Sequence, residues 1–542
     1  MNELLRMDEC FDPQMNLLRR AAKSPGYHTQ LADGTMVHET RQSMDYALLC
    51  LASKDSGHVD RACRVVDAVL NLQVTDPLKP HFGIWGWFAE EPPEQMSPAD
   101  WNWADFIGAR IAQILVQHAE AVGQERVSRM NDALERAAMA IFRRQSPVGY
   151  TNIAIMGSVV TAAAGELLSR PILLEYGRQK LRAVLELARE IGTFSEYNSP
   201  TYTMVAIEEC ERALLLTRDS ALRATARDLL SVAWQMVADH WHAPTKQWAG
   251  PHGRAYSDRL SAETRHRIER AIGIANKPDA DGVVPSLPCP PEQARKFVEP
   301  IVEPRTVEMP LGGEVDGERK VAITWLAPTC CLSSVTREHT WTQRRQILAY
   351  WPADDDVAMF KVQFLMDGRE MPGMRLGTSQ YQNRILLAAY PLHNCGAWHP
   401  QFHIPPRTEY EMSDLRFRFG LNAPGASVRQ LSPTRFELTA ADHRVVIDTV
   451  DGDFDGAPIR WSPVSGTDQV SLDAICVEKS KRVCFETLRL RFAAAIQLIA
   501  PGLKWIESPV VLTDAGENRL ATWEGSGTGP VTVPMVAKAF SW

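Results

Sequence analysis

The spacing of apolar residues changes once along this chain of 542 residues, and that change most constrains its fold. From about residue 40 to 275, apolar residues recur every three or four positions, as in amphipathic helices. From about residue 319 onward they alternate with polar residues in short runs, as in β-strands. We therefore expect one region that buries helices against helices and another that buries sheet against sheet.

The helical region consists of successive amphipathic runs joined by short links, many of which contain proline or glycine. The runs cover 40–53, 59–73, 104–120, 126–144, 153–168, 171–191, 202–217, 220–241 and 261–274. Proline and glycine end helices, and consecutive helices with short links pack as antiparallel hairpins. We expect a helical domain over residues 1–275.

The C-terminal region contains short strand signals separated by Asn, Asp and Gly turns. Examples are VAITWL from 321, VAMFKVQFLM from 357, RILLAAYP from 384, RFELTA from 435, HRVVIDTV from 443, RVCFETLRLRF from 482 and VVLTD from 510. Many short strands in one region predict a large antiparallel β-sandwich, here over residues 319–542. Residues 276–318 are rich in proline, glycine and charge and are predicted to be a linker.

Helical hairpins followed by a large sandwich resemble the architecture of a group of carbohydrate-active enzymes. In that group an α/α-toroid, which is an incomplete barrel of helical hairpins, precedes a large antiparallel β-sandwich. The group includes heparinase-, alginate- and chondroitin-type polysaccharide lyases and related glycoside hydrolases. The resemblance covers nearly the whole chain and is architectural, and it implies a toroid that carries catalysis and an oligosaccharide substrate.

Composition excludes several other classes of protein. The net charge is −8 and the isoelectric point is about 6.0, so no electrostatic footprint for nucleic acid is present. No apolar run is long enough to cross a membrane, and the N-terminal MNELLRMDECFDPQ is too charged for a secretory signal. We expect a cytoplasmic protein with no nucleic-acid or membrane partner. The sequence leaves open whether the chain forms a homo-oligomer.

Cofactor and metal motifs are missing from the sequence. The ten cysteines are scattered without a CxxC pair, and no P-loop, GxSxG, HExxH or strand-linked GxGxxG occurs. His240 and His242 form an HxH pair, which is a weak zinc signal by itself. We expect neither a cofactor nor a metal ion.

The loop that precedes the predicted helix at 104–120 combines tryptophans with carboxylates. Indole faces stack on the C–H faces of sugars and carboxylates accept hydrogen bonds from hydroxyl groups, so this loop is predicted to bind substrate. The alternative is that the tryptophans fill the centre of the toroid and Asp100 caps a helix. The predicted binding residues are Trp87, Glu90, Glu91, Trp101, Trp103 and Asp105.

A second candidate is the start of the predicted helix at 153–168. Asn152 supplies a side-chain amide there. A lyase needs such a group to neutralise a uronate carboxylate and acidify its C5 proton. The alternative is a helix N-cap, which Thr151 or Asn152 would supply equally well.

The third candidate is the segment FSEYNSPTY at 194–202. Ser199 and Pro200 are a typical N-cap and first-turn pair, but this does not explain Glu196, Tyr197 and Asn198 before them. Three large polar residues at a hairpin tip suit a ligand site. We predict a catalytic role for Glu196 and binding roles for Tyr197 and Asn198.

The fourth candidate is the loop after the predicted helix at 220–241. Within five residues it carries His252, Arg254 and Tyr256, which can act as a general acid or base, a uronate-binding cation and a phenol. In the strand region, the resemblance to the lyases suggests that His399 or His403 of WHPQFHIPP adds a histidine to the cleft. The alternative is a solvated, proline-rich loop.

Three functions remain open from sequence. The first is a lyase that cleaves uronic-acid oligosaccharides by β-elimination. Asn152 and Arg254 would neutralise the carboxylate. Tyr256 or His252 would act as base and acid, which resembles the pairing of histidine and tyrosine in the lyases. The second is a glycoside hydrolase that uses paired carboxylates among Glu90, Glu91, Asp105 and Glu196. The third is a non-catalytic glycan-binding protein. Titratable residues gathered on several loops favour the two enzymes.

Overall fold

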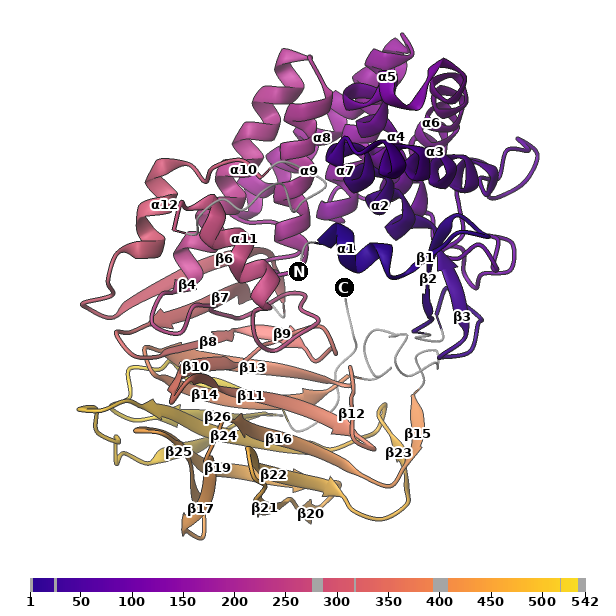
Figure 1. Ribbon diagram of the computed structural model, residues 1–542. Helices are drawn as coiled ribbons and strands as arrows, with labels where there is room; N and C mark the ends of the chain where they lie inside the picture. The colour runs from indigo at the N-terminus through magenta and orange to yellow at the C-terminus, as the bar shows by residue number, and fades with distance from the viewer. Residues whose placement is uncertain are drawn as a thin grey trace.

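The structure is a computed structural model that describes residues 3–23, 27–274, 286–315, 318–392, 408–516 and 518–534. Helices occupy the N-terminal half and antiparallel sheets the C-terminal half, so the predicted order is confirmed. In Figure 1 the helices, indigo to magenta, lie above the stacked strands, which are orange to yellow.

The helices begin and end close to the predicted ranges, and local signals set their ends. Asp55 caps α3 by accepting a hydrogen bond from the His58 N–H, and Asp219 caps α10 in the same way. Pro171 opens α8, and Gly192 ends it with φ 79°. The helices are α1 (Glu3–Asp8), α2 (Thr40–Ser53), α3 (Ser56–Asn71), α4 (Asn102–Gln117), α5 (Ala119–Val122), α6 (Gln124–Arg144), α7 (Thr151–Leu167), α8 (Pro171–Ile191), α9 (Tyr202–Leu216), α10 (Ser220–His240), α11 (Ala262–Ala271) and α12 (Pro291–Val298).

The long helices form two layers. α2, α4, α7 and α9 contact one another in that order, and α3, α6, α8 and α10 pack against them as their sequence neighbours. α7 is buried at every residue from Thr151 to Gly165. A Cβ added at Gly177 of α8 would lie 2.5 Å from the Ser158 carbonyl oxygen, so α7 and α8 approach backbone to backbone.

Two large antiparallel sheets make up most of the strand-rich half. The nine-stranded sheet has the order β21 (Arg460–Val464), β22 (Gln469–Val477), β16 (Leu415–Asn422), β11 (Asp356–Met366), β10 (Leu348–Ala353), β8 (Cys331–Val335), β7 (Glu318–Leu326), β6 (Arg305–Val315), with β12 (Arg369–Glu370) on β11. The eight-stranded sheet has the order β17 (Ser427–Ser432), β18 (Arg435–Ala440), β19 (His443–Phe454), β24 (Leu490–Ile499), β14 (Arg384–Pro391), β13 (Met374–Tyr381), β9 (Arg337–His339), with β20 (Ala457–Pro458) on β19.

The two large sheets share one apolar core. It contains Trp351 and Phe360 from the nine-stranded sheet and Ile385 and Leu387 from the eight-stranded sheet. Because successive side chains point to opposite faces of a strand, Leu386 lies on the other face of β14. There it packs with Trp523 and Val533 of the small sheet β25 (Val510–Ala515), β26 (Asn518–Trp523) and β27 (Val531–Pro534), which explains why β14 is buried on both sides.

Several short elements were not predicted. The N-terminal segment forms a sheet of β1 (Phe11–Asp12), β2 (Leu17–Ala21) and β3 (Met36–Glu39), and β4 (Trp241–His242) pairs with β5 (Gln247–Trp248). α12 and β6 lie within the predicted linker at 276–318, so sheet structure begins there. The run predicted as one strand from 482 is divided between β24 and β23 (Lys481–Cys484), which pairs with β15 (Glu409–Met412).

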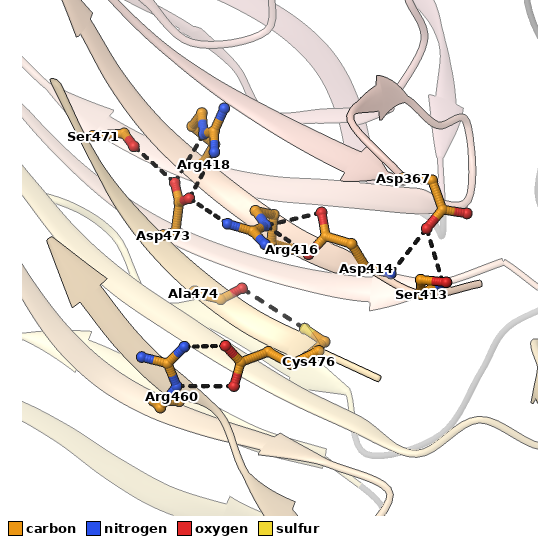
Figure 2. A network of polar contacts seen from close by, with 11 residues as sticks. Asp367, Ser413, Asp414, Arg416, Arg418, Arg460, Ser471, Asp473, Ala474 and Cys476 are labelled. Atoms are coloured by element: carbon orange, nitrogen blue, oxygen red, sulfur yellow. Dashed lines mark hydrogen bonds and ion pairs between the residues drawn. The ribbon is translucent and has the colours of Figure 1, made fainter. Parts of the chain in front are cut away.

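A buried carboxylate on the nine-stranded sheet is fully neutralised by its neighbours (Figure 2). Asp473 is buried, and its oxygens accept hydrogen bonds from Arg416 at 2.7 Å, Arg418 at 2.7 and 2.9 Å, and the Ser471 hydroxyl at 2.9 Å. Arg416 also binds Asp414. Buried charges persist when they are paired and hydrogen-bonded in this way.

The halves meet through backbone and side-chain hydrogen bonds. His252 and Arg345 exchange backbone hydrogen bonds of 3.0 Å each, as in a short stretch of sheet. The Thr324 hydroxyl donates to the Gly250 carbonyl oxygen at 2.5 Å, and a His242 ring nitrogen lies 3.0 Å from the Ala327 carbonyl oxygen. These contacts place the loop at 249–256 against the strand-rich half.

Candidate active site

A cleft of about 1270 Å³ lies between the two halves. Its helical wall comes from the ends of α2, α4, α7 and α9 and from the loop at 254–256. Its strand wall comes from the segments at 341–345 and 361–370. Aromatic side chains are prominent among the lining residues, namely Tyr27, Trp87, Phe106, Tyr150, Tyr202, Tyr256 and Trp341.

The cleft is cationic although the chain carries net negative charge. Among the described lining residues, five are Lys or Arg and two are carboxylates: Arg41, Arg254, Arg345, Lys361 and Arg369 against Asp100 and Glu370. The Asp258 carboxylate accepts hydrogen bonds from Arg345 at 2.5 Å and from Lys361 at 2.6 Å, which partly neutralises the strand wall. An excess of cations in a cleft favours an anionic ligand.

Four helix N-termini add to this positive potential. Arg41, Asn102, Asn152 and Tyr202, which lie in the first turns of α2, α4, α7 and α9, all line the cleft. Free N–H groups and the helix dipole make such ends favourable for negative charge. The Arg41 guanidinium lies 3.9 Å from the centre of the Phe106 ring.

Arg254 is held at the junction of the two walls. It donates to Glu196 at 2.8 Å and to the Gln343 side-chain oxygen at 2.8 Å. The Glu196 carboxylate also accepts a hydrogen bond from the Asn152 N–H at 3.3 Å. Burial raises the pKa of Glu196, and the Arg254 charge opposes that rise. Glu196 does not line the cleft itself, so its observed contacts are those of a group that positions Arg254.

Two phenols meet beside this guanidinium. The hydroxyl oxygens of Tyr202 and Tyr256 are 2.5 Å apart, and the Arg254 guanidinium carbon lies 4.2 Å from the centre of the Tyr202 ring. Tyr256 is 64% exposed, and both phenols line the cleft. Burial raises the pKa of Tyr202, so Tyr202 keeps its proton and can donate it to the Tyr256 oxygen.

Asn152 presents an amide to the cleft. The residue is buried, and its side-chain oxygen has no hydrogen-bond partner in the described part of the chain. Most buried polar atoms have a partner, and an exception marks a place for a ligand or water. The helix-cap alternative receives no support, because α7 has no side-chain cap hydrogen bond at Tyr150.

The tryptophan loop reaches the cleft mainly through Trp87. The Trp87 N–H donates to Asp100 at 3.0 Å, and the ring stacks on Trp103 with centres 5.2 Å apart. Trp103 in turn donates to the Thr40 hydroxyl at 2.9 Å and does not line the cleft. Trp101 lines a smaller pocket beside the cleft.

His252 and Asn198, which were predicted to be catalytic and binding residues, are buried and support the loop that carries Arg254. His252 is 2% exposed and one ring nitrogen lies 2.7 Å from the Asn198 carbonyl oxygen, while burial lowers the pKa of the ring to about 3. The Asn198 amide donates to the carbonyl oxygens of Ala249 and Pro251 at 2.8 and 2.9 Å. Neither side chain lines the cleft, and both hold the loop that carries Arg254.

The remaining predicted residues lie away from the cleft. Tyr197 is buried against Glu338 at the junction of the halves. Glu90 binds His38, and Glu91 accepts the Gln30 N–H at 2.6 Å. Asp105 is buried in α4, where burial raises its pKa to about 8. His399 and His403 lie outside the described residues.

Several cleft residues were missed by sequence reasoning. Tyr202 ends the segment FSEYNSPTY, and Tyr150 lies two residues before Asn152, but neither residue was predicted to have a role. Trp341, Gln343 and Arg345 come from the loop between β9 and β10. Nothing in the local sequence distinguishes that loop, because its role depends on where the strand half packs.

The described histidines and acidic residues do not gather into a metal site. In residues that the structure describes, no group of three or more His, Cys, Asp or Glu side chains is arranged to hold a metal ion. A His240 ring nitrogen lies 2.8 Å from the Met236 carbonyl oxygen, and both His242 ring nitrogens contact protein oxygens. Of the described helices, none is both long enough and apolar enough to cross a membrane.

Residues 2–267, just under half of the chain, match a protein family described as a domain of unknown function, DUF8769. No curated protein matches the sequence. The family match therefore covers the helical half and carries no activity with it.

Comparison with solved structures gives carbohydrate-active enzymes, as the predicted architectural resemblance expects. Heparinase III is similar with 9% identity over 92% of this chain and 82% of that chain, at a TM-score of 0.47. The Streptomyces coelicolor A3 chondroitin AC lyase, solved with chondroitin sulphate, is similar with 9% identity over 91% and 80%, at 0.44. A GH127 β-L-arabinofuranosidase from Geobacillus stearothermophilus T6 is similar with 11% identity over 84% of this chain and 91% of that chain, at a TM-score of 0.23. Reaction and substrate must be argued from the site.

Proposed function

We propose that this chain is a carbohydrate-active enzyme that cleaves uronic-acid-containing oligosaccharides by β-elimination. In this proposal the two helix layers are an α/α-toroid and the two large sheets a β-sandwich, with the cleft between them as active site. The observation that carries the proposal is the pair of phenols, Tyr202 and Tyr256, beside Arg254 in a cationic cleft.

β-Elimination requires three groups around the sugar. One neutralises the carboxylate so that the C5 proton becomes acidic, one takes that proton, and one protonates the leaving oxygen. The electron pair of the C5–H bond forms the C4–C5 double bond, and the pair of the C4–O bond leaves with the oxygen. No water is consumed.

Arg254 and Asn152 are assigned to the carboxylate. Arg254 stays oriented by Glu196 and Gln343, so its position costs little reorganisation when substrate binds. The Asn152 amide lines the cleft without a partner for its oxygen. That oxygen would accept a hydrogen bond from a protonated carboxyl or a sugar hydroxyl, whereas the amide N–H₂ donates to a carboxylate.

Tyr256 is assigned as base and then acid. As a phenolate it accepts the C5 proton, and Tyr202 stabilises that phenolate by donating across 2.5 Å. The protonated Tyr256 then donates to the leaving oxygen, which restores the phenolate. His252, the other candidate for this role, is buried behind the loop and bound to the Asn198 backbone.

The cleft walls favour an acidic sugar over a neutral one. Trp87 and Tyr150 offer flat faces for the ring, and Arg41 together with the helix N-termini favours negative charge. A glycoside hydrolase is supported less well. Of the carboxylates predicted for it, Glu90, Glu91 and Asp105 lie away from the cleft and Glu196 is paired with Arg254.

The test is product analysis on a panel of glucuronate-, galacturonate- and mannuronate-containing oligosaccharides. Mass spectrometry separates the reactions, because elimination splits the substrate without adding water and hydrolysis adds one water. We expect products whose masses sum to that of the substrate. Products heavier by one water would establish hydrolysis, and binding without any product would establish a glycan-binding protein.

A further inference from the structure

A second, smaller pocket of about 530 Å³ adjoins the cleft. Asp100, Asn102 and Tyr150 belong to both, so the two spaces share a wall. Farther from the cleft it is lined by Trp101 and Arg144, together with His81. We call this space the side pocket.

Arg144 lines the side pocket with part of its hydrogen-bonding capacity unused. Its Nη1 atom is buried and has no hydrogen-bond partner within the described chain. The Asp105 carboxylate oxygen Oδ2 is 3.6 Å away and also lacks a hydrogen bond among those residues. The two side chains form a long ion pair, and burial raises the pKa of Asp105 while the Arg144 charge opposes that rise, so Asp105 compensates the Arg144 charge only in part.

Other buried polar atoms of the side pocket are equally unsatisfied. The Asn102 side-chain oxygen and the His81 Nδ1 have no hydrogen-bond partner in the described residues. The Asn102 amide nitrogen donates to the Tyr150 hydroxyl at 3.3 Å, which fixes the orientation of the amide. Several unsatisfied polar atoms in one pocket indicate a ligand that pairs with them.

Trp101 supplies an apolar face in the same space. Its ring centre lies 6.0 Å from that of His81 and the side chain is half-buried. A flat aromatic face with polar atoms around it is what a sugar ring requires of a binding site. The Asp100 carboxylate on the shared wall accepts hydrogen bonds from the Trp87 N–H and the Asn102 N–H.

We propose that the side pocket is a second sugar subsite, in which Arg144 binds a carboxylate or sulfate on the unit next to the one cleaved. The inference rests on the proposed function and narrows it. The substrate is then an oligosaccharide with acidic groups on neighbouring units. Carboxylate and sulfate share the chemistry that Arg144 recognises, and the choice of probe separates them.

The experiment measures binding in the Tyr256→Phe chain, so that the probe is not consumed. Calorimetric titration uses tetrasaccharides of alginate and chondroitin sulfate, which carry acidic groups on neighbouring units, and carboxyl-reduced alginate tetrasaccharide as the uncharged probe. Arg144→Gln should weaken binding of an acidic probe about tenfold to a hundredfold, as expected for loss of a charge-assisted hydrogen bond. It should leave the uncharged probe unaffected, and Arg144→Lys should restore part of the loss.

Arg143→Gln is the matched control. Arg143 lies on the same turn of α6, is exposed, and its guanidinium carbon lies 5.5 Å from the Phe82 ring centre, outside the side pocket. Its substitution should change no affinity. Trp101→Ala should weaken acidic and uncharged probes equally, since it removes a stacking face and no charge, and this variant keeps the subsite testable if Arg144→Gln does not fold.

Three results would overturn the subsite. The first is an equal loss of affinity for acidic and uncharged probes in Arg144→Gln. The second is unchanged affinity in both Arg144→Gln and Trp101→Ala, and the third is no binding of any probe. Cleavage of the panel by the native chain without dependence on Arg144 or Trp101 would reject the subsite and keep the proposed function. Binding that depends on Arg144, without cleavage by the native chain, would keep the subsite and reject elimination. A loss confined to the chondroitin sulfate probe would support the subsite and assign sulfate.

Discussion

The Asp473 network of the strand-rich half and the polar groups of the cleft differ in how completely they are hydrogen-bonded. Asp473 on the nine-stranded sheet is buried, and two arginines and a serine satisfy its oxygens (Figure 2). Asn152 and Arg144 at the helical wall are buried or half-buried, yet each keeps an atom without a hydrogen-bond partner in the described residues.

This difference separates stability from function. Leaving a buried polar atom unpaired costs about 1–3 kcal/mol of folding free energy. Several such atoms in one pocket therefore indicate a binding site, in which a ligand supplies the missing hydrogen bonds. The satisfied network stabilises the sheet and needs no ligand. Unpaired buried atoms also occur elsewhere in the described chain, for example at Trp325 and Gln380. Those of Asn152, Asn102 and Arg144 differ because they line the cleft and the side pocket, where a substrate would pair with them.

Among the variants that compare unpaired with paired polar groups, the largest expected effect comes from removing the amide at Asn152. Asn152→Ala should lower kcat by about 10²–10³, because the uronate loses a group that stabilises its developing charge. The free energy of unfolding should change by less than about 1 kcal/mol, since the side-chain oxygen has no partner to lose among the described residues. Steady-state kinetics and urea unfolding check both. A large loss of stability would show that the amide is structural.

The opposite pattern is expected for Asp473. Asp473→Asn should lower the free energy of unfolding by about 1–3 kcal/mol, because two arginines lose their carboxylate. Both arginines are partly exposed, so water limits the loss. Activity should stay unchanged in urea-free buffer. A fall in kcat with unaltered unfolding would contradict the assignment of this network to stability.

Tyr202→Phe tests the phenol pair through its pH dependence. The base acts when deprotonated, so kcat/KM should rise with pH, and the high pKa of Tyr202 keeps its proton available to the Tyr256 phenolate. Without that donor the apparent pKa of the rate profile should move upward by about one unit, with about tenfold lower activity near neutral pH. An unchanged profile would remove Tyr202 from the mechanism.

The smallest effect is expected at Asp105, where burial raises the pKa from 3.8 to about 8. The folded chain holds this proton while the unfolded chain has released it, so stability falls as pH rises between these two values. Asp105→Asn should therefore flatten that slope and stabilise the fold above pH 8. Thermal unfolding at a series of pH values measures this. Equal slopes in both proteins would contradict a protonated Asp105.

The order of helices and strands could be predicted because apolar periodicity is local. The helix at 171–191 coincides with α8, where Pro171 and Gly192 mark both ends. The run from 482 was predicted as one strand, since alternation continues across residues 485–489, where β23 ends and β24 has not begun. The sheet of β1, β2 and β3 was missed because its strands are too short to show a period.

The site was predicted only in part because loops carry no periodicity. His252 and Tyr256 lie four residues apart, yet one is buried and the other 64% exposed. Gly253 lies between them against Tyr197: an added Cβ would be 2.9 Å from the Tyr197 carbonyl oxygen. Arg254 follows this close approach and is held by Glu196 and Gln343, and Gln343 comes from the strand-rich half, so its position depends on how the two halves pack.

The most direct test of the central claim is ultraviolet absorbance during incubation with the uronic-acid oligosaccharides. A C4–C5 double bond conjugated to the carboxylate absorbs, whereas hydrolysis products do not. We expect absorbance to rise with the native chain and with Tyr381→Phe, an exposed tyrosine of β13 outside the cleft, and to fall by about 10²–10⁴ in rate with Tyr256→Phe. New reducing ends without absorbance, or full activity of Tyr256→Phe, would contradict elimination by the phenol pair.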